Sequence, residues 1–332
     1  MNRRVSNKIT HLYFIMAILI LNLHSAYMYL FEASNLAVEI NQVIKIICNM
    51  SVPTFFFISA LLFYRNCEGK QYIKVILEKI KTLVIPYVCW NIICFPLKEI
   101  KNILTDGSVS VSNIWEIIYN ILMSEYDPVL WFVRILFIYF IIYPIILAIV
   151  KKPVACFSAI LLIFLLNIFI GPTVGYSSVR YWLPIYMLGA YLGYWKKNEI
   201  FENHIEPNYI HISFAVLVLL GIVTFAYLSD LGMYICRMVS PLCYWVIGDI
   251  FLTDKKTCWV EKQSFFIYCT QMIFSIVAQQ IWIFIFGNKS ISAIFSNIGI
   301  PMILLFVIGI VAYLFNKIAP KFYALLTGGR VA

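Results

Sequence analysis

Residues 129–149, VLWFVRILFIYFIIYPIILAI, carry one charged side chain, Arg134, in 21 positions. A helix needs about 20 mostly apolar residues to cross the hydrocarbon core of a bilayer, so this stretch is long enough to span it. Nine further stretches have the same character: residues 12–31, 43–64, 83–97, 154–171, 180–195, 210–228, 232–252, 264–286 and 296–316. We therefore expect an all-α, polytopic integral membrane bundle of about ten transmembrane helices.

The composition excludes a soluble fold. Of 332 residues, 62% are hydrophobic and 12% are charged, with a mean hydropathy of +0.88. Soluble domains contain about 25% charged residues, which they need to cover their surface. No repeat period and no low-complexity linker divides the chain. We expect a single membrane domain over residues 1–332.

The distribution of basic residues predicts how the chain is threaded. Lys and Arg collect in cytoplasmic loops of membrane proteins. With both ends (1–11 and 317–332) in the cytoplasm, eighteen of the 25 basic residues fall in inner segments, five in outer segments and two within spans. The inner set comprises Arg3, Arg4, Lys8, Arg65, Lys70, Lys74, Lys79, Lys81, Lys151, Lys152, Lys196, Lys197, Lys255, Lys256, Lys262, Lys317, Lys321 and Arg330. The net charge of +9 is thus spread between spans, and it does not indicate nucleic-acid binding.

The one long outer connection, 98–128, is acidic and contains apolar residues at helical spacing. These are Ile114, Ile117, Ile118, Ile121 and Leu122. The pattern is typical of a helix that lies at the outer interface or covers a cavity. A surface helix that only shields the bundle has the same pattern, and both interpretations stay open.

Among the ionisable residues within the expected spans, where desolvation is costly, we single out His24, Arg134, Arg237 and Asp249. Neutral histidine accepts a proton from a hydroxyl near pH 7, so His24 is a candidate general base, or else a helix-packing residue. Arg134 binds an anionic substrate group, pairs with an acid of the outer connection, or extends toward the outer edge. Asp249 lies near the inner face, where water can solvate it.

The inner segment 65–81, RNCEGKQYIKVILEKIK, is basic and partly helical. Such a cluster beside a span contacts anionic lipid or binds the phosphates of a cytosolic donor. The nine cysteines are scattered through apolar segments and form no cluster with histidine, so we interpret them as small buried hydrophobes and expect no metal site.

Three sequence blocks resemble the integral-membrane acyltransferase 3 family. The first block, at 51–66, is SVPTFFFISALLFYRN and is similar to the family's SVPLFFxISGxLL segment. The second block, at 79–90, is KIKTLVIPYVCW and is similar to the family's basic residues followed by LLIPYxxW. LWFVRILFIYFIIYP at 130–144 resembles LWFLxxLxxxYLxxP. Weaker matches follow at 180–195 and 264–274. The blocks occur in the family's order and extend over nearly the whole chain.

The resemblance implies transfer of an acyl group, usually acetyl from cytosolic acetyl-CoA, to a hydroxyl of a lipid-linked or cell-surface glycan. The family's first span carries an arginine, ten residues and then an essential histidine; here these positions are Tyr13 and His24. His24 would then deprotonate the acceptor or carry the acyl group. The candidate residues for the CoA phosphates are Lys74, Lys79 and Lys81, and those for the acceptor are Tyr13, Trp131 and Arg134.

The resemblance also implies a multi-pass protein of the bacterial cytoplasmic (inner) membrane, with the lipid bilayer, a glycan acceptor and acyl-CoA as partners. Two other hypotheses stay open. One is a membrane glycan polymerase or lipid-linked oligosaccharide transporter, which has similar spans but longer, arginine-rich outer loops. The other is a catalytically degenerate family member that keeps the fold, which Tyr13 and Gln271, at positions of a family arginine and histidine, favour.

Overall fold

The computed structural model describes residues 2–25, 27–106, 113–171, 175–202 and 206–330. Within these ranges the regular structure is helical, as predicted. Eight helical segments there are long and apolar enough to cross a bilayer. They are Arg3–Leu23, Asn35–Tyr64, Tyr72–Ile100, Pro153–Ile170, Tyr209–Leu228, Asp230–Phe251, Val260–Phe286 and Ser290–Ile318. The chain is therefore a polytopic helical membrane protein.

Three of the ten expected spans differ from the prediction. The first, expected at 12–31, is the helix Arg3–Leu23, which ends before His24. The stretch at 129–149 is broken at Ile142 into α7 (Trp131–Ile141) and α8 (Tyr143–Val150), which meet at an angle of 66°. Pro144 explains the break, since its ring lacks an N–H donor and collides with the preceding helical turn. The sixth span is α10 (Val179–Trp195), which has 17 residues and so falls short of the usual spanning length.

The centre of the bundle is the contact between α3 (Ser51–Tyr64) and α10. Gly189 and Gly193 of α10 face the backbone of α3 so closely that an added Cβ would lie 2.4 Å from the Phe57 carbonyl oxygen and 2.3 Å from that of Leu61. Most of α3 is buried. The close approach of two helices through small residues is a common way to pack helices in membranes, where lipid competes with every apolar contact.

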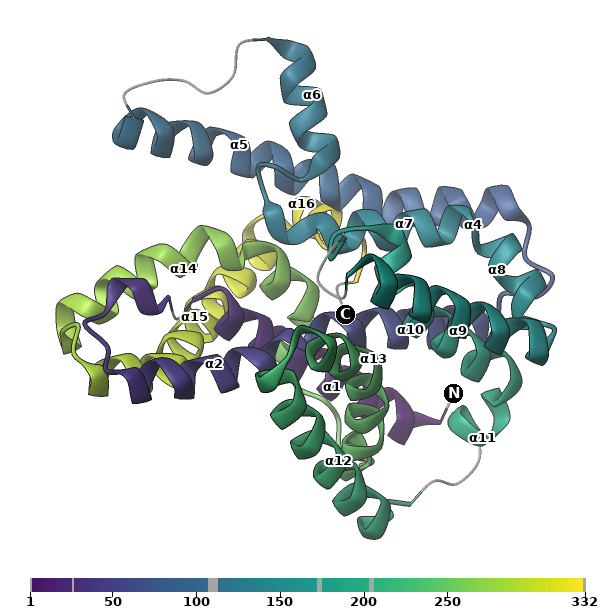
Figure 1. Cartoon of the computed structure of the whole chain (residues 1–332). Coiled ribbons are helices and arrows are strands. Elements are labelled where there is room, and N and C mark those ends of the chain that lie inside the picture. Colours follow the sequence, from purple (N-terminus) through teal and green to yellow (C-terminus); the bar gives the residue numbers. More distant parts are fainter. Residues whose placement is uncertain (1, 26, 107–112, 172–174, 203–205, 331–332) are drawn as a thin grey trace.

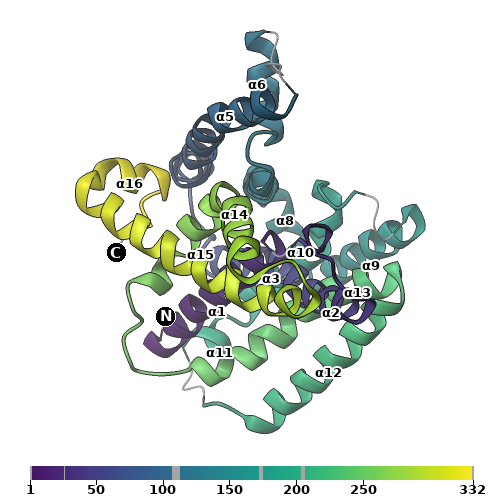
Figure 2. The ribbon, with the colours of Figure 1, turned by 90° about the vertical axis from the view of Figure 1, so that its left-hand side faces the viewer.

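Other helices surround this pair (Figures 1 and 2). Two antiparallel hairpins flank it, one formed by α12 and α13 and the other by α14 and α15. The hairpin helices are α12 (Tyr209–Leu228), α13 (Asp230–Ile247), α14 (Ser264–Phe286) and α15 (Ser290–Ile318). The N-terminal helices α1 (Arg3–Leu23) and α2 (Asn35–Asn49) pack against each other, and α1 also contacts α3 and α14. A short helix, α11 (Lys197–Phe201), follows α10 in the chain. The helix before α10, α9 (Pro153–Ile170), packs against it.

A long helical segment crosses one side of the bundle. It consists of α4 (Tyr72–Lys79), the π-helical turn η2 (Ile80–Val84) and α5 (Ile85–Asp106). The end of α5 projects from the bundle together with α6 (Ile114–Met123) in both views (Figures 1 and 2). The predicted helix of the outer connection is thus confirmed, and its apolar face is exposed, with Trp115 at 75%.

The chain ends on a short helix, α16 (Pro320–Leu326), that turns back onto α5. Trp90 donates its indole N–H to the Leu326 carbonyl oxygen at 3.1 Å, and the Tyr323 hydroxyl donates to Gln263 at 2.6 Å. Tyr323 and Leu326 are both fully buried. The tail is therefore an integral part of the bundle.

Replacing Gly189 by alanine tests the α3–α10 contact. The new methyl group would force the two helices apart, and overpacking of this kind costs about 1–3 kcal/mol. We expect Gly189→Ala to lower the apparent melting temperature of the detergent-solubilised protein. Gly221→Ala on α12 is the control, because an added Cβ there meets nothing within 4 Å. Equal melting temperatures for the two variants would contradict the close packing.

Candidate functional site

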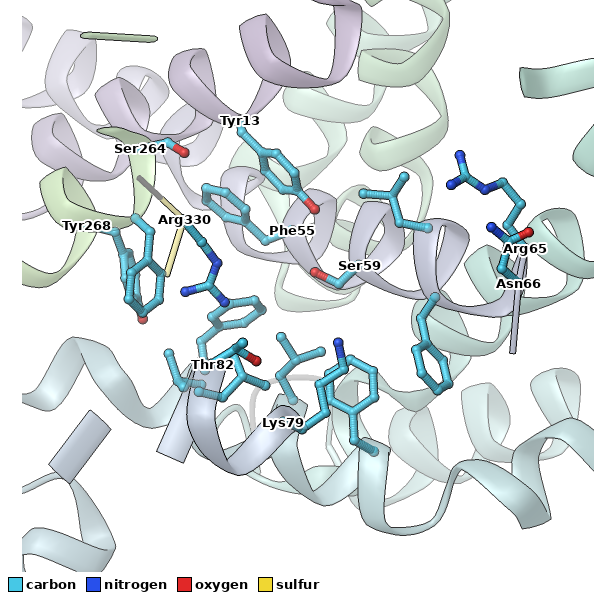
Figure 3. Close-up of a pocket in the computed structure, with 18 of the residues that line it drawn as sticks. Tyr13, Phe55, Ser59, Arg65, Asn66, Lys79, Thr82, Ser264, Tyr268 and Arg330 are labelled. Carbon is cyan, nitrogen blue, oxygen red and sulfur yellow. The ribbon is translucent and has the colours of Figure 1, made fainter. Parts of the chain in front are cut away.

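A cavity of about 440 Å³ lies between α1, α3, the α4–η2 segment, α7, α14 and the C-terminal tail (Figure 3). Small-molecule sites in proteins commonly measure about 300–1,000 Å³ and combine apolar walls with a few polar groups. Both features are present here. The lining residues are Tyr13, Phe55, Ser59, Leu62, Phe63, Arg65, Asn66, Lys70, Lys79, Thr82, Leu83, Phe132, Val133, Leu136, Phe140, Ser264, Phe265, Tyr268 and Arg330.

The residues at one end of the cavity come from the loop after α3. Arg65 is half-buried, whereas Asn66 and Lys70 are exposed, and Figure 3 shows Arg65 and Asn66 far from Tyr268 and Arg330. This loop belongs to the segment 65–81 that the distribution of basic residues predicts to be cytoplasmic. A cavity that opens here would be reached from the cytoplasm.

The polar lining of the cavity is strongly cationic. Arg65, Lys70, Lys79 and Arg330 line it, and no Asp or Glu of the described ranges does so. Lys79 lies 4.5 Å from the centroid of the Phe140 ring and 5.5 Å from that of Phe63, and Arg330 lies 4.1 Å from that of Phe265. Aromatic faces position a cation without neutralising it. The arrangement therefore provides net positive charge for an anionic ligand.

Hydroxyl groups also line the cavity. Those of Tyr13 and Ser59 are among them, and Tyr13 stacks on Phe55 with ring centroids 5.4 Å apart. Figure 3 shows the Lys79 ammonium pointing toward the α3 wall that carries Ser59. Thr82 belongs to η2, and π-helical turns are rare and frequently lie at functional sites. Hydroxyl groups of this kind orient polar groups of a bound ligand.

His24 lies at the other end of α1. It caps the C-terminus of that helix, eleven residues after Tyr13, and hence about 16 Å further along the axis at 1.5 Å per residue. It is half-buried and does not line the cavity. The Lys45 ammonium is close enough to interact with it electrostatically, and Lys45 itself donates a hydrogen bond to the Asn22 side chain at 3.2 Å. A second polar cluster thus exists at this end of α1.

The structure brings together two of the predicted site residues in the cavity, Tyr13 and Lys79. The side chains of Lys74 and Lys81 are exposed and lie outside it.

The other two residues predicted for the acceptor, Trp131 and Arg134, lie on α7 and outside the cavity. Trp131 packs on Trp182 and Tyr176, at centroid distances of 5.9 and 5.1 Å. The Arg134 guanidinium contacts the Met123 sulfur at 3.1 Å, which ties α7 to α6. Their role in binding an acceptor stays a prediction.

The other ionisable residues of the spans have partners. Asp249 does not depend on water as expected, because it pairs with the buried Lys8 ammonium at 2.5 Å. Arg237 donates to the Tyr181 hydroxyl at 2.8 Å and lies 4.6 Å from the centroid of the Tyr176 ring. Both residues are consistent with a structural role, and neither lines the cavity.

The sequence model of the acyltransferase 3 family, an acyltransferase domain, matches residues 8–317. The chain belongs to this family. No curated protein and no solved structure matches it. The protein is accordingly a multi-pass membrane acyltransferase, and its cationic cavity is the natural candidate for binding a substrate of acyl transfer.

Ser59 and Arg330 are polar residues of the cavity that the sequence does not single out as site residues. Nothing near Ser59 in the sequence marks it, because Tyr13, which lines the same cavity, is 46 positions away. Arg330 was counted only as a determinant of topology. The signal that could have found it is the run TGGR at 327–330, where two glycines precede an arginine at the end of a helix.

Proposed function

We propose that this acyltransferase moves an acyl group, typically acetyl, from cytosolic acyl-CoA to a hydroxyl of a lipid-linked or cell-surface glycan at the bacterial inner membrane. The observation that carries the proposal is the cationic cavity, which has four basic side chains and no acidic one among the described residues that line it. Coenzyme A carries a diphosphate and a 3′-phosphate, and Arg and Lys are the side chains that bind such groups. The family supplies the reaction class.

The reaction is the transfer of an acyl group from a thioester to an alcohol. The acceptor oxygen attacks the thioester carbon, its proton passes to a base, and the CoA sulfur leaves and takes up a proton. We assign the base to His24, because a neutral imidazole accepts a proton at physiological pH. Tyr13, Trp131 and Arg134 would contact the acceptor, and Lys79 the donor.

The separation of His24 from the cavity is compatible with this assignment. His24 lies about 16 Å along α1 from Tyr13. In acyl-CoA the pantetheine arm separates the thioester from the diphosphate by an extended chain. A donor whose phosphates contact the cationic end of the cavity would direct its thioester along the bundle, toward the half of α1 that carries His24.

Removal of the imidazole tests the function. The chain is expressed in a glycan-producing host without its own transferase, and ester-linked acyl groups on the glycan are measured. We expect ester with the wild type and its loss, by about 100-fold or more, with His24→Ala, since general bases contribute about 10²–10⁴-fold. His211→Ala, at an exposed position of α12, is the matched histidine control.

The alternatives give different results in the same host. Altered glycan length or export without ester would contradict the transferase and favour a polymerase or transporter. An unchanged glycan with a wild type that is folded and present in the membrane would identify a degenerate family member. Equal ester for wild type and His24→Ala would leave the transferase standing but remove His24 as its base.

A comparison of Lys79 and Lys81 distinguishes the two interpretations of segment 65–81, namely binding of the donor phosphates in the cavity and contact with anionic lipid. We expect Lys79→Gln, in the cavity, to raise the KM for acyl-CoA about 10-fold with little change in kcat, because a hydrogen bond to a charged group contributes about 1.5–3 kcal/mol. Lys81→Gln, exposed and outside the cavity, is expected to leave KM unchanged. A steady-state assay in membrane vesicles measures both. Similar KM values for the two variants would contradict a phosphate site at Lys79.

A further inference from the structure

The C-terminal tail delivers a charged side chain into the cavity. After α16, Gly328 and Gly329 adopt positive φ angles of 61° and 71°. The Gly328 amide donates to the Leu325 carbonyl oxygen at 3.3 Å and the Gly329 amide to that of Ala324 at 2.8 Å. This pair of bonds is the Schellman motif, which ends a helix and reverses the chain. The next residue, Arg330, lines the cavity as a result.

The turn is fixed by its surroundings. A Cβ on Gly328 would lie 2.3 Å from the Thr82 carbonyl oxygen, so only glycine fits between the tail and η2. The hydrogen bonds of Leu326 to Trp90 and of Tyr323 to Gln263 hold the helix before the turn. Because the tail is held at these points, the position of Arg330 is determined by the fold.

Arg330 has no acidic partner among the described residues. Its guanidinium donates to the Thr327 carbonyl oxygen at 3.1 Å and lies over the Phe265 ring. Figure 3 shows it beside Tyr268 and Thr82. The side chain is also exposed, so a ligand in the cavity can reach it. A guanidinium that is held in place without a carboxylate beside it favours a bound anion.

Lys79 approaches the same part of the cavity from the α4–η2 segment. It is close enough to Arg330 for the two charges to repel each other. The neighbouring Glu78 opposes this repulsion, but no acidic side chain of the described ranges lines the cavity itself. A ligand with adjacent negative charges removes the repulsion, so the pair is suited to a diphosphate.

We propose that Arg330 of the C-terminal tail binds, together with Lys79, the diphosphate of the acyl-CoA donor. The inference rests on the proposed function and adds to it a binding residue outside the part of the chain that the family model matches. Arg65 and Lys70, at the solvent-exposed end of the cavity, are then left for the 3′-phosphate, which is further from the thioester.

The test measures donor binding to the purified full-length protein in detergent. The ligands are acetyl-CoA, acetyl-3′-dephospho-CoA and S-acetylpantetheine, which has no phosphate. We expect Arg330→Gln to raise the Kd of the first two about 10-fold and to leave that of S-acetylpantetheine unchanged. Lys321→Gln, at an exposed position of α16, is the matched control and should change none of the three.

Gly328→Ala provides a second variant, because displacing the turn should displace Arg330 and give the same pattern of Kd values. An unchanged Kd for acetyl-CoA in Arg330→Gln would overturn the inference. So would equal weakening for all three ligands, which would identify the tail as a structural element only. A loss confined to acetyl-CoA would place Arg330 on the 3′-phosphate and overturn the assignment to the diphosphate.

The failure of the proposed function is distinguishable from the failure of the inference. If the folded wild type binds no acetyl-CoA, both are wrong. If it binds acetyl-CoA and transfers nothing to a glycan, the proposed function is wrong, while the Kd values still decide the role of Arg330. If it binds and transfers with equal Kd for wild type and Arg330→Gln, only the inference is wrong.

Discussion

The close contact between α3 and α10 is the constraint on which the rest of the site depends. Gly189 and Gly193 let the backbone of α10 reach the carbonyl oxygens of Phe57 and Leu61. That contact fixes the rotation of α3 about its axis. Its opposite face, which carries Phe55, Ser59 and Leu62 at helical spacing, is thereby turned toward the cavity. One helix thus supplies both a close backbone contact with α10 and a wall of the cationic cavity.

Charged residues are scarce in this protein, and the partners of each one indicate whether its role is structural or functional. Arg237 and the Lys8–Asp249 pair have polar or charged partners within the protein, which offsets their desolvation. Lys79 and Arg330 have aromatic neighbours, and no acidic side chain of the described ranges lines the cavity beside them, although Glu78 interacts electrostatically with Lys79 from outside it. A polyanionic substrate would therefore meet positive charge that the cavity lining does not neutralise.

The fold was predictable because the hydropathy of each local segment shows whether it can span a membrane. The site was not predictable from the sequence, since it depends on how separate helices pack against one another. Long apolar runs predicted the spans. The break between α7 and α8 was not predicted, although Pro144 indicates it. Lys79 and Lys81 look equivalent in the sequence. Two positions along a helix turn a side chain to nearly the opposite face, and only the packed structure shows that Lys79 faces the cavity. Tyr13 and Ser59 line the same cavity although they are 46 positions apart, a relation that local patterns cannot contain.

The substitution at position 13 has a physical interpretation in the same arrangement. The sequence resemblance implies an arginine where Tyr13 stands, and the loss of that charge favours an inactive protein when the first span is considered alone. In the structure Arg330 lines the same cavity as Tyr13, although the two residues come from opposite ends of the chain (Figure 3). A ligand responds to the position of a charge in the site, whichever segment of the chain carries that charge. The TGGR turn supplies a guanidinium to the region that Tyr13 lines, so the missing arginine in the first span is weak evidence against activity.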